Sequence, residues 1–162
     1  MLYAVGDIHG EREMLEELLA GLSLGADDHL IFMGDYVDRG PDSHGVVELL
    51  IQLAASHRCE FLIGNHESMF LDFLGWRGKE YFGGDAFLLN GGDRTLASYG
   101  YFDLDFPDRS TFELPKAHEA FYQGLKPYHR DGDYLFVHAG LGREVLEDRD
   151  IEFALRRVHI GS

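Results

Sequence analysis

One pattern occurs three times in the first half of the chain and constrains the fold more than any other feature. A short apolar run ends in a glycine, and polar side chains follow at once. The runs and their junctions are Leu2–Val5 before Gly6-Asp7-Ile8-His9-Gly10, Leu30–Met33 before Gly34-Asp35-Tyr36-Val37-Asp38-Arg39-Gly40, and Glu60–Ile63 before Gly64-Asn65-His66-Glu67. Apolar runs of this length are typical of buried β-strands. Because glycine allows a sharp turn at a strand end, we expect adjacent strands whose junctions converge on one point.

Residues with helical spacing separate the runs and indicate the fold class. Apolar residues recur every three or four positions between residues 11 and 22. A second, strongly apolar helix is expected to start at Pro41-Asp42-Ser43 and to end near His57. Strands that alternate with helices predict an α/β protein. Later segments are expected to form a helix and loop covering the core (69–87), an irregular connection (101–116) and a helix (116–125).

A β-hairpin is expected over residues 127–140. Asp131-Gly132 supplies the turn. Tyr134–Val137 forms the return strand, so His138 leaves a buried strand end, as Asp35 does. The histidines outside these junctions are expected to be surface residues or to be satisfied locally: His29, His44, His57, His118 and His129.

Length and composition indicate a single domain over residues 1–162, with an apolar content of 45%. The net charge of −15 argues against a nucleic acid or an anionic membrane as a partner. Cys59 is the only cysteine, so no disulfide can form within the chain, and we expect it to be a small core residue. No apolar run is long enough to cross a bilayer, and no signal-peptide pattern is visible. These features predict a cytoplasmic protein.

The residue types at the first two junctions suit metal and phosphate chemistry. Asp7 and His9 are two positions apart, so on an extended segment they would face the same side and could reach a common cation. At the second junction Asp35 could hold a metal, Arg39 could bind a phosphate with its planar guanidinium, and Asp38 could orient a neighbour. Each junction alone would be an ordinary polar loop. Their repetition favours a shared site.

The three junctions resemble the signature blocks of the phosphoprotein phosphatase family, the PPP-type serine/threonine phosphatases, within the calcineurin-like metallophosphatases. His138-Ala139-Gly140 resembles the fourth block. Asn90-Gly91-Gly92 and the following Thr95 resemble a stretch common in bacterial members, with no chemical role that we can derive. The resemblance implies a layered α-β-β-α sandwich of two mixed sheets flanked by helices, with the metals held at one edge.

The resemblance also implies two divalent metal ions, with Mn²⁺ as the first choice and Fe or Zn²⁺ as alternatives. The implied ligands are Asp7, His9 and Asp35 for the first ion, and Asp35, Asn65 and His138 for the second, with Asp35 bridging. The implied phosphate-binding residues are Arg39, Asn65 and Arg156. His66 would protonate the leaving oxygen, and Asp38 would hold its imidazole in the right tautomer.

These implied roles predict a metal-dependent phosphomonoester hydrolase, with a protein serine/threonine phosphatase that uses a two-metal-activated hydroxide as the first candidate. Its substrate would be a phosphorylated protein or a small phosphoester. Hydrolysis of diadenosine polyphosphates on the same fold is the alternative, although Val37-Asp38-Arg39 resembles the protein-phosphatase form. A non-catalytic binding module with an incomplete metal site is a candidate of a different class.

The sequence departs from the family pattern near its C-terminus. Members supply a further histidine to the second metal from a downstream Gly-His segment, which has no match here. His159 follows Val158 rather than glycine, just after a segment (148–158) that looks like the start of a helix. We therefore expect a domain that lacks its C-terminal part, with a second metal site that is short of one ligand unless His159 replaces it.

Overall fold

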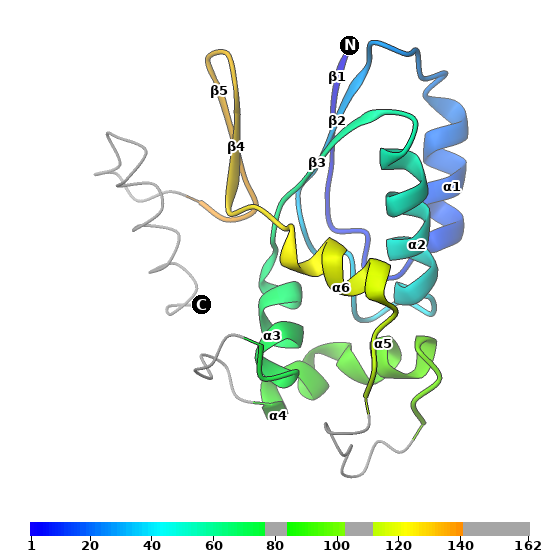
Figure 1. The fold of residues 1–162 in the computed structure, drawn as a ribbon, viewed down its shortest axis with the longest axis vertical. Coiled ribbons are helices and arrows are strands. Elements are labelled where there is room, and N and C mark those ends of the chain that lie inside the picture. The colour runs from blue at the N-terminus through cyan, green and yellow to red at the C-terminus, as the bar shows by residue number, and fades with distance from the viewer. Residues whose placement is uncertain (77–83, 103–111, 141–162) are drawn as a thin grey trace.

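The computed structural model describes residues 1–76, 84–102 and 112–140 of the chain. Tyr81, Phe82 and the helix expected after Asp148 lie outside these ranges. The described elements run from β1 near the N-terminus to the β4–β5 hairpin (Figure 1).

The three apolar runs form adjacent strands, as predicted, and the sheet they build is parallel. Its strands are β1 (Leu2–Val5), β2 (His29–Phe32) and β3 (Arg58–Phe61), in that order across the sheet. The register aligns Val5 with Phe32, and Phe32 with Phe61, so all three carboxyl ends lie at one edge. The central strand β2 is buried throughout. Ligand sites of α/β proteins collect at this edge.

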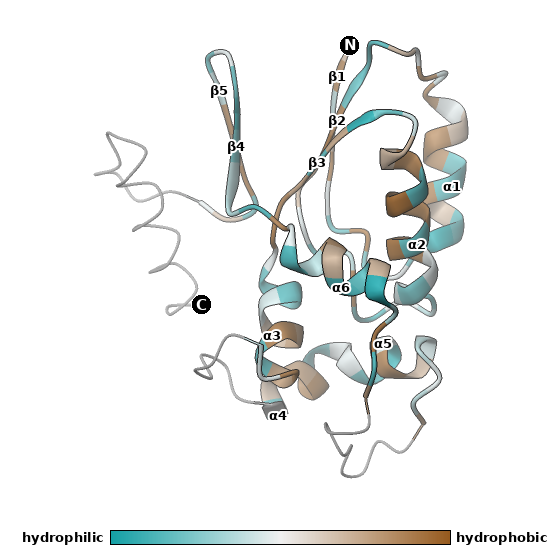
Figure 2. Ribbon diagram, in the orientation of Figure 1, coloured by the Kyte–Doolittle hydropathy of each residue, from teal (hydrophilic) through white to brown (hydrophobic). Residues whose placement is uncertain are grey.

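Two helices pack beside the sheet in Figure 1, namely α1 (Arg12–Gly21) and α2 (Ser43–Ala54). Asp42 caps α2, because its carboxylate accepts a hydrogen bond from the Gly45 amide at 2.7 Å. Apolar residues dominate α2, whereas α1 is mixed (Figure 2). Val46, Val47 and Leu50 of α2 are completely buried, so this helix forms much of the core.

Four short helical segments lie beyond the carboxyl ends of the strands (Figure 1). They are α3 (Asn65–Phe73), α4 (Gly84–Phe87), the π-helical turn Leu88–Gly92, and α5 (Asp93–Ser98). Phe70, Phe73 and Phe87 are buried in the core, as expected, whereas Trp76 is exposed. A further helix, α6 (Lys116–Gln123), leads toward the hairpin.

The predicted hairpin is confirmed as β4 (Tyr128–Asp131) and β5 (Tyr134–Val137), which pair antiparallel. The hairpin stands beside β3 in Figure 1. Lys126, just before β4, joins it to the sheet: the Lys126 N–H donates to Phe61 O (2.9 Å), and the Lys126 C=O accepts from Ile63 N (2.8 Å). The α/β fold is confirmed; among the described residues, one sheet is parallel and the other is this hairpin.

Cys59 is half-buried against the core, and burial raises the pKa of its thiol to about 11. In the described part of the chain, no helix has the length and apolar character needed to cross a membrane.

Candidate metal centre and catalytic residues

The first two junctions lie side by side and are joined through their backbones. Asp7 N donates to Gly34 O (3.3 Å), His9 N to Asp35 O (2.9 Å), and Gly10 N to Tyr36 O (2.8 Å). These bonds continue the pairing of β1 and β2 past the strand ends. The predicted convergence of these junctions follows directly from the parallel register.

The backbone at these junctions is in the left-handed region. Asp7, His9, Asp35, Asp38 and Arg39 have φ values between 48° and 72°, and they account for five of the six non-glycine residues with positive φ in the described ranges. The extended geometry assumed for Asp7 and His9 is therefore wrong. Such conformations cost on the order of 1–3 kcal/mol each, persist only where surrounding contacts impose them, and cluster at functional sites.

Buried Glu67 provides much of that constraint, and sequence reasoning gave it no role. Its Oε2 accepts from the backbone N–H groups of Asp35 (2.8 Å) and Gly64 (2.9 Å), and its Oε1 accepts from Tyr36 N (2.7 Å). Burial, with the nearby charge of Asp35, raises the pKa of Glu67 to about 7 against these hydrogen bonds. Glu67 thus binds the second junction to the third.

The third junction is the start of a helix rather than the expected loop. Asn65 and His66 occupy the first turn of α3, and His66 N donates to Asp35 Oδ1 at 3.1 Å. Glycine is required just before this turn, because a Cβ on Gly64 would lie 2.1 Å from Asp35 Oδ1. The close approach places the Asp35 carboxylate at the positive end of α3.

Two groups of possible metal ligands share Asp35. Ligand atoms of Asp7, Asp35 and His138 lie within 4.8 Å of one another, and so do those of His9, Asp35 and His66. Asn65 Oδ1 lies 3.1 Å from His138 Nε2, so it adjoins the first of these groups. All five predicted ligands are thus brought to one place, but the grouping pairs Asp7 with His138 rather than with His9. The division of ligands between two ions stays a prediction.

The histidines are oriented as metal ligands would be. His9 Nδ1 donates to Val37 O (3.0 Å) and His138 Nδ1 donates to Met33 O (2.9 Å). These bonds fix each ring and leave Nε2 directed at Asp35 Oδ2, at 3.8 Å for His9 and 3.4 Å for His138. A carbonyl bonded to one ring nitrogen, with the other nitrogen directed at the metal site, is the usual arrangement of a metal-binding histidine.

Asp35 and His138 are coupled electrostatically. Burial opposes ionisation of Asp35, but the hydrogen bond and charge of His138 outweigh it, so the pKa of Asp35 lies below its usual value. Burial likewise opposes the charge on His138, yet the contact with Asp35 raises the pKa of His138 to about 9.

His66 and Asp38 form a buried pair, as the predicted roles require. His66 Nδ1 donates to Asp38 Oδ2 at 2.6 Å, and both side chains are almost completely buried. Burial raises the pKa of Asp38, although hydrogen bonds from His66 and Thr95 oppose the rise. Thr95 is a residue that sequence reasoning missed: its hydroxyl donates to Asp38 Oδ1 (2.7 Å) and accepts from Asp38 N (2.8 Å).

Arg39 is exposed, and its guanidinium lies between two imidazoles. Its terminal nitrogens donate to His9 Nε2 and His66 Nε2, each at 3.0 Å. The Arg39 backbone N–H donates to Gly91 O at 3.2 Å. Gly91 has a φ of 95°, and a Cβ at this position would lie only 2.8 Å from Arg39 N, so only glycine fits there. Gly91, to which no role was assigned, therefore supports the Arg39 backbone.

Other features add nothing to the centre. Arg156 and His159 lie outside the described residues, so their predicted roles stay predictions.

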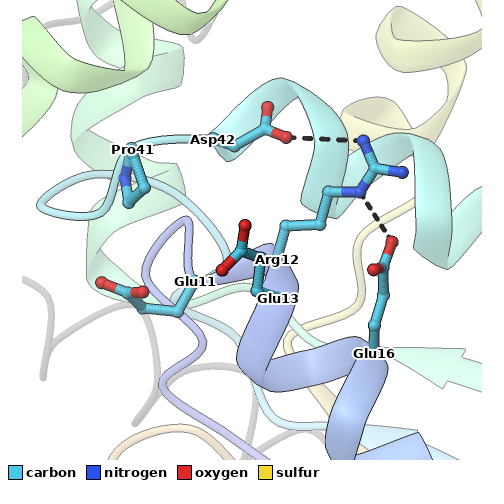
Figure 3. A pocket seen from close by; sticks show the side chains of 6 residues that line it. All are labelled: Glu11, Arg12, Glu13, Glu16, Pro41 and Asp42. Atoms are coloured by element: carbon cyan, nitrogen blue, oxygen red, sulfur yellow. Dashed lines mark hydrogen bonds and ion pairs between the residues drawn. The ribbon is translucent and has the colours of Figure 1, made fainter. Parts of the chain in front are cut away.

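A pocket beside the first two junctions is lined by Glu11, Arg12, Glu13, Glu16, Pro41 and Asp42 (Figure 3). Arg12 is paired there with Glu16 (2.9 Å) and Asp42 (3.5 Å), so the pocket offers an acidic surface rather than a phosphate site.

Comparison with known proteins places this geometry in context. The chain is 38% identical over 105 residues to serine/threonine-protein phosphatase 2 of Escherichia coli (strain K12), a match that covers 64% of this chain and 41% of that protein. It is 41% identical over 71 residues to the asymmetrical bis(5'-nucleosyl)-tetraphosphatase PrpE of Oceanobacillus iheyensis, covering 38% of this chain and 28% of that protein. The chain thus spans less than half the length of either relative.

A solved structure shows the same fold. A cold-active protein tyrosine phosphatase superposes with a TM-score of 0.62 at 21% identity, covering 96% of this chain and 47% of the other. The family model described as calcineurin-like phosphoesterase matches residues 2–158, which is nearly the whole sequence. The chain belongs to the calcineurin-like phosphoesterase family.

Proposed function

We propose that this chain carries the metal ligands of a metal-dependent phosphomonoester hydrolase whose preferred substrates are phosphoserine and phosphothreonine in proteins. One observation carries the proposal. The Asp35 carboxylate is shared by two groups of metal-ligand atoms, and His66 with its buried partner Asp38 lies in one of them.

The side chains fit two divalent ions. Their ligand atoms are carboxylate or amide oxygens and imidazole nitrogens, without a thiolate, which suits Mn²⁺ first and also Fe or Zn²⁺. The Nδ1 atoms of His9 and His138 already donate to carbonyls, so each ring offers Nε2. Asp7, His9, Asp35, Asn65 and His138 would hold the ions. When bound, two such metal ions lower the pKa of a coordinated water molecule and neutralise negative charge on the phosphoryl group.

The chain's own residues would bind the phosphoryl group and supply a proton. Exposed Arg39 has two terminal nitrogens on the side of His9 and His66, a fork that matches two phosphate oxygens. Because Asp38 accepts from His66 Nδ1, Nε2 is the atom that faces the site. His66 Nε2 accepts from Arg39 in the structure. In the charged form of His66, which Asp38 would favour while holding the ring, Nε2 would carry the proton that goes to the leaving oxygen.

Two observations rank the substrates. The Escherichia coli serine/threonine-protein phosphatase matches 64% of this chain, whereas the Oceanobacillus dinucleotide hydrolase matches 38%. Asp38 immediately precedes Arg39, as in the protein-phosphatase form. Diadenosine polyphosphate hydrolysis is the second candidate, supported by the 41% identity to the Oceanobacillus protein.

The test is metal-dependent turnover of three substrates by the purified chain: p-nitrophenyl phosphate, a phosphoserine peptide and diadenosine tetraphosphate. We expect Mn²⁺-dependent hydrolysis that a chelator abolishes, with the peptide preferred over the dinucleotide. Asp35→Asn should abolish turnover, whereas the matched control Asp27→Asn, at an exposed loop acid, should not. Preference for the dinucleotide would favour the second candidate.

A binding module without catalysis would give a different result. It would bind a phosphopeptide but show no turnover with any metal, even though circular dichroism reports a folded chain. That outcome would refute the hydrolase proposal. A C-terminally extended version belongs in the same assay, because the family pattern calls for a further histidine ligand downstream of the fourth block.

A further inference from the structure

A second cluster of metal-ligand residues lies at the opposite edge of the sheet. Ligand atoms of His29, His129 and Asp131 lie within 4.8 Å of one another. His29 opens β2, and Asp35 follows the other end of that strand, which runs about 10 Å. The cluster is therefore separate from the candidate metal centre and belongs to the contact between the sheet and the hairpin.

His29 departs from the expectation of a surface or locally satisfied residue. It is only 4% exposed, and its Nδ1 bonds to Asp131 Oδ2 at 3.2 Å. Its Nε2 is buried and has no hydrogen-bond partner in the described part of the chain, and the same holds for Nε2 of His129. A buried polar atom without a hydrogen-bond partner destabilises the fold, so two such atoms in neighbouring rings require an explanation.

The geometry and charge of this cluster suit a cation. The two imidazole rings have centroids 5.3 Å apart and are nearly perpendicular, at 88°. A second carboxylate, Glu60, places Oε1 3.9 Å from His129 Nδ1 while also pairing with Lys126 at 2.5 Å. Nitrogen ligands about 2.0 Å from a tetrahedral zinc lie about 3.3 Å from each other. The ligand atoms therefore need to close by at most about 1.5 Å.

The cluster also has an entry path. The side chain of Asp131 is 40% exposed, whereas those of His29 and His129 are 6% and 14% exposed. An ion can therefore reach the imidazoles from the carboxylate side, where the hairpin turns. Two imidazoles and one carboxylate form a common zinc ligand set, with water in the remaining position.

We propose that His29, His129 and Asp131 form a second cation site, of the zinc class, that ties the β4–β5 hairpin to the start of β2. His29 comes from the sheet, and the other two residues come from β4. The site holds the turn end of the hairpin, while His138 follows the other end of β5. A cation here would fix the strand that presents His138 to the candidate metal centre.

The test counts zinc bound to the full 162-residue chain with and without the cluster. The chain, His129→Gln and Asp131→Asn are each saturated with Zn²⁺, freed of unbound metal and analysed by atomic emission. His57→Gln is the matched control, since His57 bonds Ser56 Oγ and belongs to none of the ligand groups in the described part of the chain. We expect each cluster variant to hold one zinc fewer than the parent and the control to hold the same number. The candidate metal centre is intact in all four proteins, so its occupancy cancels.

A second measurement follows the hairpin itself. Zn²⁺ should slow hydrogen exchange of the β4 and β5 amides in the parent and the control, and should not in Asp131→Asn. This variant changes a half-exposed side chain, and circular dichroism establishes that it is folded. If His129→Gln and Asp131→Asn both keep the full zinc count, the site is refuted. If hairpin exchange is the same with and without zinc in the parent, the tie to the sheet is refuted.

Discussion

Thr95→Val tests whether the buried carboxylate behind His66 is tuned from a distant helix. Thr95 lies in α5, 57 positions from Asp38, and both residues are completely inaccessible to solvent. Valine keeps the shape of threonine but has no hydroxyl. The change therefore removes two contacts to Asp38 and one to Ser43 Oγ (3.1 Å), while the side chain keeps its volume. Thr95→Ser is the matched control, because it keeps the hydroxyl and loses only a methyl group.

The magnitude follows from the contacts. The hydroxyl donates to Asp38 Oδ1 at 2.7 Å, and a hydrogen bond to a charged group contributes about 1.5–3 kcal/mol. It also accepts from Asp38 N at 2.8 Å, a bond of about 1 kcal/mol. Asp38 N retains Ser43 Oγ at 3.1 Å, so it is not left without a partner. Thr95→Val should lower the free energy of unfolding by about 2–4 kcal/mol, and Thr95→Ser by about 1 kcal/mol.

The same change should alter the pH dependence. Burial raises the pKa of Asp38, and the Thr95 hydroxyl opposes this, so Thr95→Val should raise the pKa further. A carboxyl with a raised pKa binds a proton more tightly when folded, so its ionisation costs stability as pH rises. The decrease in the free energy of unfolding caused by Thr95→Val should thus be greatest at neutral pH, where Asp38 is charged. It should shrink as pH falls through the raised pKa of Asp38.

Urea unfolding at several pH values measures the stability change, and the pH profile of kcat with an alkyl phosphate measures the effect on His66. We expect the acidic limb to move to higher pH in Thr95→Val and to stay in place in Thr95→Ser. Equal stabilities and equal profiles for the two variants would refute the reasoning. Thr95 would then be a packing residue only.

Three further predictions concern the metal centre. Asp35→Asn should lower bound metal and turnover more than Asp7→Asn, because Asp35 belongs to both ligand groups; two bound ions and normal turnover would contradict its assignment. His66→Asn should slow alkyl phosphates far more than aryl phosphates with acidic phenols, and equal losses across a leaving-group series would remove His66 from the role of acid. Glu67→Gln replaces one acceptor oxygen with an amide NH₂ that would face backbone N–H donors. Urea unfolding should therefore show a free energy of unfolding lower by about 3 kcal/mol, and a decrease below about 1 kcal/mol would contradict the bridging role.

The repeated junctions were readable because their signals are local. An apolar run of strand length, a glycine and a polar side chain are neighbours in sequence, and parallel pairing alone brings such strand ends together. The fold class, the hairpin and the meeting of the three junctions could be predicted in this way, whereas the place of His138 beside them was implied by the family resemblance. The strand boundaries could not be set to the residue: β3 ends at Phe61, because Leu62 and Ile63 turn toward Lys126.

Tertiary structure decided how these groups are held. Glu67 joins two junctions through backbone amides 31 and 32 positions away, and Thr95 reaches Asp38 over 57 positions. His29 meets Asp131 across 102 positions. A side chain's chemistry and its spacing along a helix or strand are properties of the local sequence. Which buried donor meets which acceptor depends on how separate elements pack, because every such group must find its partner within the few ångströms that the folded backbone allows.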